Sequence, residues 1–496
     1  MTKQVYCSHN PSLSLWQSAV HSVLAKHAGP QDAQNAGIGV SAALPHMLAT
    51  AQVLRHFDST GNFDLPAPAF VAAPAVLQDS AAPPCAPPAV VVCARLAAQA
   101  ALYAVTDPAQ SAALRDELKD STCDPLWAEC LAQYDLWRAS GTTQPYFPYT
   151  GIGDFVLEQC FPDDATIAVI GDWGTGMNDA LVLLEQIGKN FQPHVLLHLG
   201  DIYYSGLPSE CSAHFTQLID QVWPDGGVKP LVFTLDGNHD RYAGANGGYY
   251  DLIKNLNTAA GKPQPNSYFA LRNNFWQFVV MDTGYNDSDP FSESGAITSL
   301  VPQEIPWHLD KISNHGAGVD RNVNPGGARG TVLLSHHQLF SFTGVGKNSD
   351  GCQVAVNPNL ATAFAPVFPL VDLWLWGHEH TLCIFEPYAN GPGQPLPRGR
   401  CVGASAVPVY LSQAPAVPAG MALPPGAAGP PQSLAGTTLG NNGTIFNYCY
   451  AMIRLAGPSL SIDYYQVDST NATPGNPPPL GKPLYSESFA KPLAAA

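Results

Sequence analysis

The chain has 496 residues, of which 46% are hydrophobic and 12% are charged, and its formal net charge is −17 at pH 7. This length exceeds what one ordinary core requires, so we expect two domains or one large domain with extensions. The acidic balance argues against a surface that binds polyanions, and we therefore expect no nucleic-acid partner.

The 11 cysteines include no Cys-x-x-Cys pair, which excludes a zinc ribbon and argues against a thioredoxin-type site. The first residues contain no apolar run of the kind that marks a secretory signal. The longest apolar stretch, about 89–105, contains Arg95 and is too short to span a membrane. We therefore expect a soluble, cytoplasmic protein without a membrane partner.

Residues 1–160 differ in composition from the rest of the chain. Seven prolines between Pro66 and Pro88 predict an irregular crossing segment. Around it, apolar residues recur at helical spacing in 13–27, 95–104, 109–119 and 125–139. The sequence thus predicts a mostly helical, Pro/Ala-rich N-terminal extension without concentrated catalytic chemistry, which we interpret as a structural or partner-binding cap.

From residue 161 onward, strand-like and helix-like segments alternate, which predicts an α/β domain over 161–496. A long segment at 407–441, rich in Pro, Ala and Gly, is predicted to be a loop that could cover the site, and its role stays open. The predicted strands are 166–170, 195–199, 231–235, 275–282, 331–335, 372–376, 444–454 and 459–466, and the predicted helices are 177–190, 211–222 and 302–314.

Five short polar blocks each follow an apolar, strand-like run. The blocks are GDWG at 171–174, GDIYY at 200–204, GNHD at 237–240, SHH at 335–337 and GHEH at 377–380. Because ligands of open α/β sheets bind beyond the carboxyl ends of the strands, we expect these blocks to converge. Each block is unremarkable alone, but five in this order predict a site for two metal ions.

The residue types in the blocks suit metal coordination. Asp172 and Asp201 each end a strand, and the two oxygens of Asp201 can bridge two cations. Tyr204 follows at i+3 and could fold its phenol back onto the same ion, where a phenolate favours Fe(III). Asn238 offers a neutral amide oxygen.

The histidines of the last three blocks divide into ligands and catalytic candidates. His336 and His337 are adjacent at a strand end, so their side chains diverge, and we choose His336 as the ligand. His378 and His380 can enter one cleft, one for each ion. His239 can reach a substrate rather than the ion and could orient it or protonate a leaving oxygen, and His337 is the second candidate.

The five blocks resemble those of the calcineurin-like metallophosphoesterase superfamily, and they are similar to its purple acid phosphatase-like branch. Gly174 stands where the general family has a ligand histidine, and Tyr204 supplies a phenol instead. The resemblance covers about 166–385 and implies a four-layer α/β/β/α sandwich of two mixed sheets. Plant-type members carry further histidines about ten residues after the fourth block, but 341–350 contains none. The proton donor therefore stays open.

Carried over to this sequence, the resemblance implies two ions bridged by Asp201, the first Fe(III) and the second Zn(II), Mn(II) or Fe(II). It implies that the first ion binds Asp172, Asp201, Tyr204 and His380, and that the second binds Asp201, Asn238, His336 and His378.

The implied activity is hydrolysis of small phosphomonoesters by in-line attack of a metal-bound hydroxide. A phosphodiesterase or nucleotide pyrophosphatase on the same ions is the alternative. A metal-binding scaffold without turnover is the third possibility. The sequence does not predict the oligomeric state.

Overall fold

The computed structural model of the chain divides into two compact units, Met1–Gly141 and Thr142–Ala496. The structure describes residues 107–110, 145–203, 205–224, 227–287, 297–409, 411, 414–443, 445–468 and 473–490. In the first unit, 108–110 are helical. The helices predicted for 13–27, 95–104, 109–119 and 125–139 otherwise lie outside the described residues. The second unit holds all five blocks.

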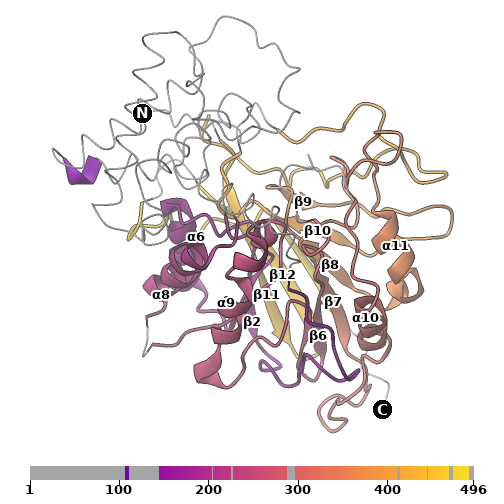
Figure 1. Ribbon diagram of the computed structural model, residues 1–496, viewed down its shortest axis with the longest axis horizontal. Helices are drawn as coiled ribbons and strands as arrows, with labels where there is room; N and C mark the ends of the chain where they lie inside the picture. The colour runs from indigo at the N-terminus through magenta and orange to yellow at the C-terminus, as the bar shows by residue number, and fades with distance from the viewer. Residues whose placement is uncertain are drawn as a thin grey trace, which may run out of the picture. The chain divides into compact units, whose positions relative to one another are not determined.

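Two mixed β-sheets form the centre of the second unit (Figure 1). The first sheet has seven strands in the order β1 (Val156–Leu157), β5 (Phe269–Arg272), β6 (Trp276–Val280), β7 (Gly330–Leu334), β8 (Leu373–Trp376), β10 (Gly399–Val402) and β9 (Leu382–Ile384). The second has six strands in the order β13 (Tyr485–Ala490), β12 (Ser459–Val467), β11 (Tyr448–Ala456), β2 (Thr166–Ile170), β3 (Val195–His198) and β4 (Leu231–Thr234).

The strands that precede the five blocks are parallel within their sheets. In the six-stranded sheet, β2, β3 and β4 run parallel to one another, while β11, β12 and β13 complete the sheet in antiparallel fashion. In the seven-stranded sheet, β6, β7, β8 and β10 are parallel. Parallel neighbours end at the same edge, so each sheet delivers its polar blocks to one side.

Helices cover the outer face of each sheet, on opposite sides of the pair (Figure 1). The six-stranded sheet carries α6 (Asn178–Asn190), α7 (Pro208–Glu210), the π-helical η2 (Cys211–Thr216), α8 (Gln217–Val222) and α9 (Tyr249–Asn255). The seven-stranded sheet carries α10 (Glu304–Ser313), α11 (Pro358–Phe364) and the 3₁₀ helix η6 (Ala365–Leu370). Short 3₁₀ turns are η3 (His239–Arg241), η4 (Gly244–Asn246) and η5 (Thr258–Ala260). The predicted four-layer α/β/β/α sandwich is thus confirmed.

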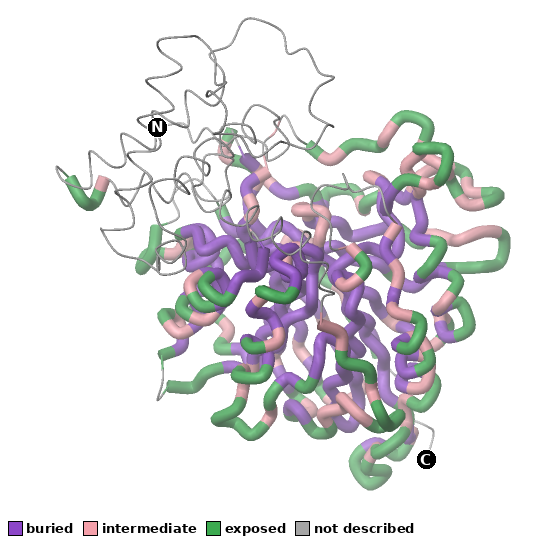
Figure 2. The backbone as a smooth tube through the Cα atoms, viewed as in Figure 1, coloured by how far each residue is buried: buried purple, intermediate pink, exposed green. Residues whose placement is uncertain are grey.

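Successive side chains of a strand point to opposite faces of its sheet, so each strand contributes to the core between the sheets and to a core under the helices. In β2, Ile167 and Val169 join the cluster between the sheets, whereas Ala168 and Ile170 pack against the helices. In β7, Val332 faces the inter-sheet core and Leu333 the cluster under α10 and α11. Figure 2 shows this buried interior between exposed loops. Each fully buried aliphatic side chain contributes about 1.5–3 kcal/mol.

The predicted loop at 407–441 lies along the free edge of β9. Within its described residues, Leu434 N donates to Ile384 O at 2.7 Å, and Glu386 N donates to Gln432 O at 2.8 Å. Further along, Ala422 exchanges backbone hydrogen bonds with Gln353 and Ala355. The segment therefore covers a sheet edge that would otherwise expose unpaired backbone groups. A covering role over the five blocks stays a prediction.

At the β4 edge of the six-stranded sheet, two side-chain amides pair with the backbone of the edge strand. Asn257 accepts a hydrogen bond from Val232 N and donates one to Val232 O, both at 2.7 Å. Gln264 accepts from Thr234 N at 2.9 Å and donates to Thr234 O at 2.8 Å. Each amide reproduces the pairing of a neighbouring strand, which leaves this edge closed to another chain.

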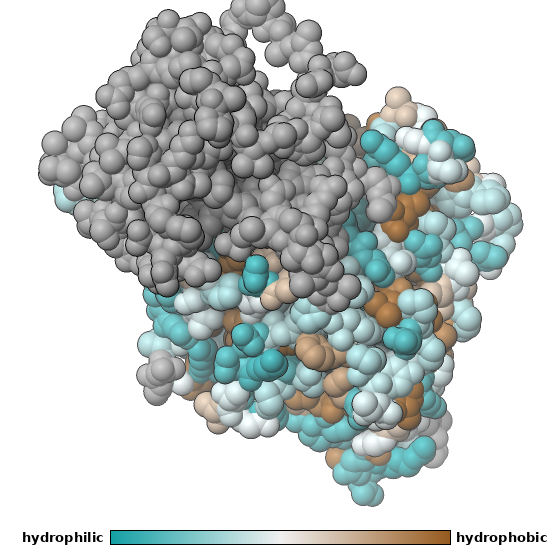
Figure 3. Space-filling view, viewed as in Figure 1, coloured by the Kyte–Doolittle hydropathy of each residue, from teal (hydrophilic) through white to brown (hydrophobic). Residues whose placement is uncertain are grey.

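None of the helices in the described part of the chain has the length and apolar character needed to cross a membrane. On the described face in view, hydrophobic side chains form separate small areas among hydrophilic ones (Figure 3).

We expect Gln264→Ala to lower the free energy of unfolding by about 1–3 kcal/mol, because it leaves the buried Thr234 N–H without a partner. Thr234 O keeps the hydroxyl of Tyr249 at 2.9 Å, so the loss comes mainly from the donor. Chemical denaturation measures the change. Asn255→Ala, which removes an exposed amide, is the control, and an equal effect of both substitutions would contradict the edge argument.

Candidate metal centre

The five blocks meet where the parallel strands of both sheets end. Asp172 follows β2, Asp201 follows β3 and Asn238 follows β4, all in the six-stranded sheet. His336 follows β7 and His378 follows β8 in the other sheet. The site is therefore built from the carboxyl ends of five strands, as the sequence predicts.

Four of the predicted ligands have left-handed backbone conformations. Their φ angles are 55° at Asp172, 75° at Asp201, 67° at His378 and 45° at His380. These are half of the eight non-glycine residues with positive φ in the described part of the chain. Such conformations cost free energy and persist where the surrounding structure enforces them, typically at functional sites. The concentration of strain marks this strand edge as a site.

Glycines beside the carboxylates keep the space that the blocks require. A Cβ at Gly237 would collide with Asp201 Oδ1, and a Cβ at Gly377 would collide with Asp172 Oδ2. The Gly-Asn-His and Gly-His-Glu-His patterns thus have a steric basis, because a neighbouring block occupies the place of the missing side chain.

The first donor group consists of Asp172, Asp201, Tyr203 and His380. The carboxylates and His380 each place a ligand atom within 4.8 Å of the others. Tyr203 Oη lies 3.2 Å from Asp172 Oδ1, 3.2 Å from Asp201 Oδ2 and 2.9 Å from His380 Nε2. Tyr204, which the sequence analysis assigns to this ion, lies outside the described residues. The phenol that the structure places here belongs to Tyr203.

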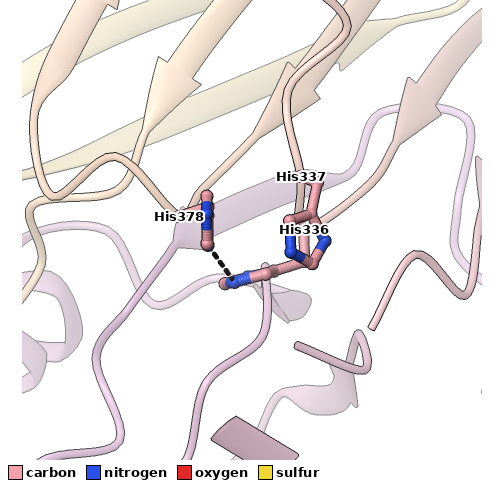
Figure 4. Close-up of side chains that lie close together, drawn as sticks. All are labelled: His336, His337 and His378. Carbon is pink, nitrogen blue, oxygen red and sulfur yellow. Dashed lines mark hydrogen bonds between the residues drawn. The ribbon is translucent and has the colours of Figure 1, made fainter. Parts of the chain in front are cut away.

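The second donor group consists of Asn238, His336 and His378. Asn238 Oδ1 lies 2.9 Å from His336 Nε2 and 3.1 Å from His378 Nδ1, and these two nitrogens are 3.2 Å apart. His336 Nδ1 lies 2.8 Å from Leu199 O, to which it donates, so Nε2 is free of its proton in the neutral ring. Figure 4 shows His336, His337 and His378 gathered at this edge.

Asp201 joins the two groups. Its Oδ2 lies beside Tyr203, whereas its Oδ1 lies 3.3 Å from His336 Nε2. One carboxylate thus offers an oxygen to each group, which is the geometry of a bridging ligand. The His378 loop is tied to the first group as well, because His378 N donates to Asp172 Oδ2 at 2.8 Å.

The donor set fits two metal ions of the first transition row. Ligand atoms bound at 2.0–2.2 Å around a tetrahedral or octahedral ion lie roughly 2.8–3.6 Å from one another. The separations of 2.9–3.2 Å within the second group and 2.9–3.4 Å within the first fall in that interval. Imidazole, carboxylate, amide and phenol donors also suit iron, zinc or manganese.

The pKa shifts at the site show that the buried carboxylate of Asp201 needs a positive charge beside it. Burial opposes ionisation of Asp201, but the imidazoles of His336, His239 and His378 outweigh it and hold the pKa of Asp201 well below its usual value. Burial also opposes protonation of His336, yet Asp201 prevails and raises the pKa of His336 to about 10. Without ions, a proton on His336 compensates the carboxylate, and a bound cation would replace that proton.

The other imidazole of the second group resists protonation. Burial, then the neighbouring His337 and His336, hold the pKa of His378 well below its usual value. A neutral imidazole is the form that binds a metal.

The two catalytic candidates lie differently. His337 Nε2 lies 3.0 Å from Asp287 Oδ2, and His337 Nδ1 lies 3.1 Å from Thr283 Oγ1. Its ring centroid is 4.3 Å from that of His378, but both ring nitrogens have partners in the protein. His239 is only half-buried, and its backbone N donates to Asp201 Oδ1 at 3.1 Å. Of the two, His239 has the more accessible side chain.

Sequence reasoning did not foresee how two carboxylates support the blocks. Asp240 Oδ2 accepts from the backbone N of Asp201 at 2.9 Å and of Gly237 at 2.8 Å, which ties two blocks together. Burial, then the charge of Asp201, raises the pKa of Asp240 to about 7. Glu379 accepts from Thr343 Oγ1 at 2.6 Å and Trp376 Nε1 at 3.1 Å. Their positions within the blocks suggest a role at the site, but the sequence does not predict the partners that other segments supply.

Comparison with known proteins agrees with the site. Residues 165–382 match the model of the calcineurin-like phosphoesterase family. The matched region runs from just before β2 to the start of β9 and contains all five blocks. The chain thus contains a calcineurin-like phosphoesterase domain over these residues, and the predicted superfamily is confirmed. No curated protein matches the sequence.

Solved structures similar to this chain are distant. Purple acid phosphatase PPD1 from yellow lupin seeds is 15% identical, with a TM-score of 0.38 over 66% of this chain and 55% of that one. GAP50, the anchor in the inner membrane complex of Plasmodium, is 14% identical, with a TM-score of 0.39 over 66% of this chain and 89% of that one. PhoD is 12% identical, with a TM-score of 0.39 over 71% of each chain. The family assignment rests on the matched family model.

We expect Tyr203→Phe to remove any visible absorbance that iron loading gives the protein while leaving the fold intact, because a phenolate bound to Fe(III) would be the source of such absorbance. Tyr204→Phe is the matched control. Absorbance spectra of both variants at equal iron content decide between the two phenols. Colour that survives in Tyr203→Phe and disappears in Tyr204→Phe would instead support the i+3 spacing of the sequence analysis.

Proposed function

We propose that the domain hydrolyses small phosphate monoesters at a pair of metal ions, in the manner of the purple acid phosphatase-like branch. The observation that carries the proposal is the sharing of Asp201 between two donor groups whose internal spacings suit transition-metal ions. The family match over 165–382 supports a phosphoesterase. We further propose Fe(III) with the first group, and Zn(II), Mn(II) or Fe(II) with the second.

The chain's own residues supply the frame for that chemistry. When bound, the two ions would supply the positive charge that clamps the attacking and leaving oxygens and activates water. Asp172, Asp201 and a phenolate contribute about three negative charges against about five from such a pair, so the site keeps a positive charge that attracts phosphate. The −17 of the whole chain is spread over a screened surface.

His239 is our candidate for the group that protonates the leaving oxygen. Its backbone N donates to Asp201, the carboxylate that the two donor groups share, and the residue is only half-buried. His337, whose ring nitrogens lie against Thr283 and Asp287, would need to break a hydrogen bond to act.

We expect His239→Ala to lower kcat by about 10²–10⁴-fold on an alkyl phosphate, because a poor leaving group needs a proton in the transition state. On an aryl phosphate, whose leaving group departs as an anion more readily, the loss should be much smaller. Steady-state kinetics on both substrates measure the contrast. Equal losses on the two esters would show that His239 does not serve as the acid.

We expect Asp201→Asn to abolish turnover and to reduce the bound metal to less than two ions per chain, because the bridge loses its charge and one of its oxygen donors. Elemental analysis and hydrolysis of an aryl phosphate measure the two effects. Asp163→Asn changes a carboxylate at the far end of β2, which bonds Asn274, and should leave both unchanged. Activity retained in Asp201→Asn would contradict the two-ion site.

The choice of ester is tested on the unchanged protein. Hydrolysis of an aryl monoester in preference to its bis-ester supports a phosphomonoesterase, and the reverse preference supports the phosphodiesterase or pyrophosphatase alternative. A protein that binds two ions but cleaves neither ester would support a scaffold role. The low content of Lys and Arg, 22 residues, supports small phosphate esters over nucleic acids.

A further inference from the structure

Two tyrosine rings enclose the imidazole of His239. The centroid of the Tyr203 ring lies 4.5 Å from that of His239, and the Tyr242 ring lies 4.7 Å from it. The interplanar angles are 52° and 55°, so both rings are tilted onto the imidazole. Both tyrosines are buried, with 4% and 8% of their surface exposed. Contacts of this kind are favourable and restrict rotation of the enclosed ring.

The hydroxyl of Tyr242 reaches the second donor group. Asn238 Nδ2 donates to Tyr242 Oη at 2.6 Å, while Asn238 Oδ1 faces His336 and His378. Asn238 is only 5% exposed, so its N–H groups depend on partners inside the protein. The phenol therefore accepts from the amide in the one orientation that turns the amide oxygen toward a cation.

We propose that Tyr242 is a positioning residue with two separable functions. Its hydroxyl orients Asn238 as a ligand of the second ion, and its ring holds His239 against Tyr203 for proton transfer. The second function rests on the proposed phosphatase activity, whereas the first concerns metal affinity alone. Tyr242 follows His239 by three residues across the 3₁₀ turn η3, which places its ring beside the imidazole and its hydroxyl beside the amide.

Two substitutions separate the functions. Tyr242→Phe keeps the ring and removes the hydroxyl, and we expect the affinity for the second ion to fall by about 10- to 100-fold, as for other outer-shell ligand partners. Affinity for the first ion should not change. Saturation with metal should restore kcat, because His239 remains enclosed. Tyr242→Leu removes both features, and kcat should stay about 10- to 100-fold low even at saturating metal, with KM little affected.

The control is Tyr450→Phe in β11, which removes a buried hydroxyl that donates to Gln186 of α6 at 2.9 Å. Metal affinity is measured by competition with a chelator, using Zn(II) alone and then Fe(III) with Zn(II). Thermal denaturation confirms that each variant folds. Placing Tyr242→Leu in a His239→Ala background tests whether the ring acts through the imidazole, because the second substitution should then add no further loss of kcat.

Each outcome bears on one part of the proposal. Tyr242→Phe that binds the second ion as tightly as Tyr450→Phe would overturn the role of the hydroxyl. Losses of kcat from Tyr242→Leu and His239→Ala that multiply would overturn the role of the ring. Protein that holds two ions but hydrolyses no phosphate ester would refute the proposed function and leave the hydroxyl role to be decided by metal affinity.

Discussion

The candidate metal centre depends on the contacts that the buried carboxylate of Asp201 makes with both donor groups. Asp201 is buried at 1% exposure, with one oxygen toward each donor group, and a buried charge of this kind is stable only among opposite charges or strong donors. The surrounding imidazoles meet that need in the metal-free protein by retaining a proton on His336. A pair of cations would compensate this charge better, because the remaining donors, Asn238 and His378, are neutral and offer lone pairs to a metal. The same charge balance thus explains the low pKa of Asp201 and the suitability of the site for cations.

The fold provides that arrangement through the direction of its strands. Two sheets pack face to face, and in each the strands that precede the polar blocks run parallel, so five chain segments far apart in sequence end together. Residues that follow these strands turn sharply, and Asp172, Asp201, His378 and His380 do so with positive φ. Asp240 then links the loops after β3 and β4 by accepting from Asp201 N and Gly237 N. Hydrogen bonds to backbone groups, and not only contacts between side chains, thus hold these loops in place.

Much of this could be predicted from the sequence, for a physical reason. Apolar runs that end in Asp or His identify strands and their carboxyl ends, so the location of the centre and the four layers were accessible. The place of Tyr203 between Asp172 and His380 was not, because it depends on contacts between blocks that lie far apart in the sequence. The amides of Asn257 and Gln264 at the β4 edge were also hidden, since they lie 23 and 30 residues beyond Thr234 and act through tertiary contact. For residues 1–144, the helical spacing stays a prediction apart from 108–110.

The left-handed backbone at four ligands has a thermodynamic consequence. Each such residue costs about 1–3 kcal/mol relative to a relaxed turn, and this strain is concentrated in the loops that would hold the ions. Cation binding offsets it only in the folded chain, because an unfolded chain cannot bring the five segments together. Folding equilibrium and metal occupancy would then be thermodynamically linked, and the melting temperature would rise with the concentration of free ions. A chelator would therefore act on this protein as a mild denaturant.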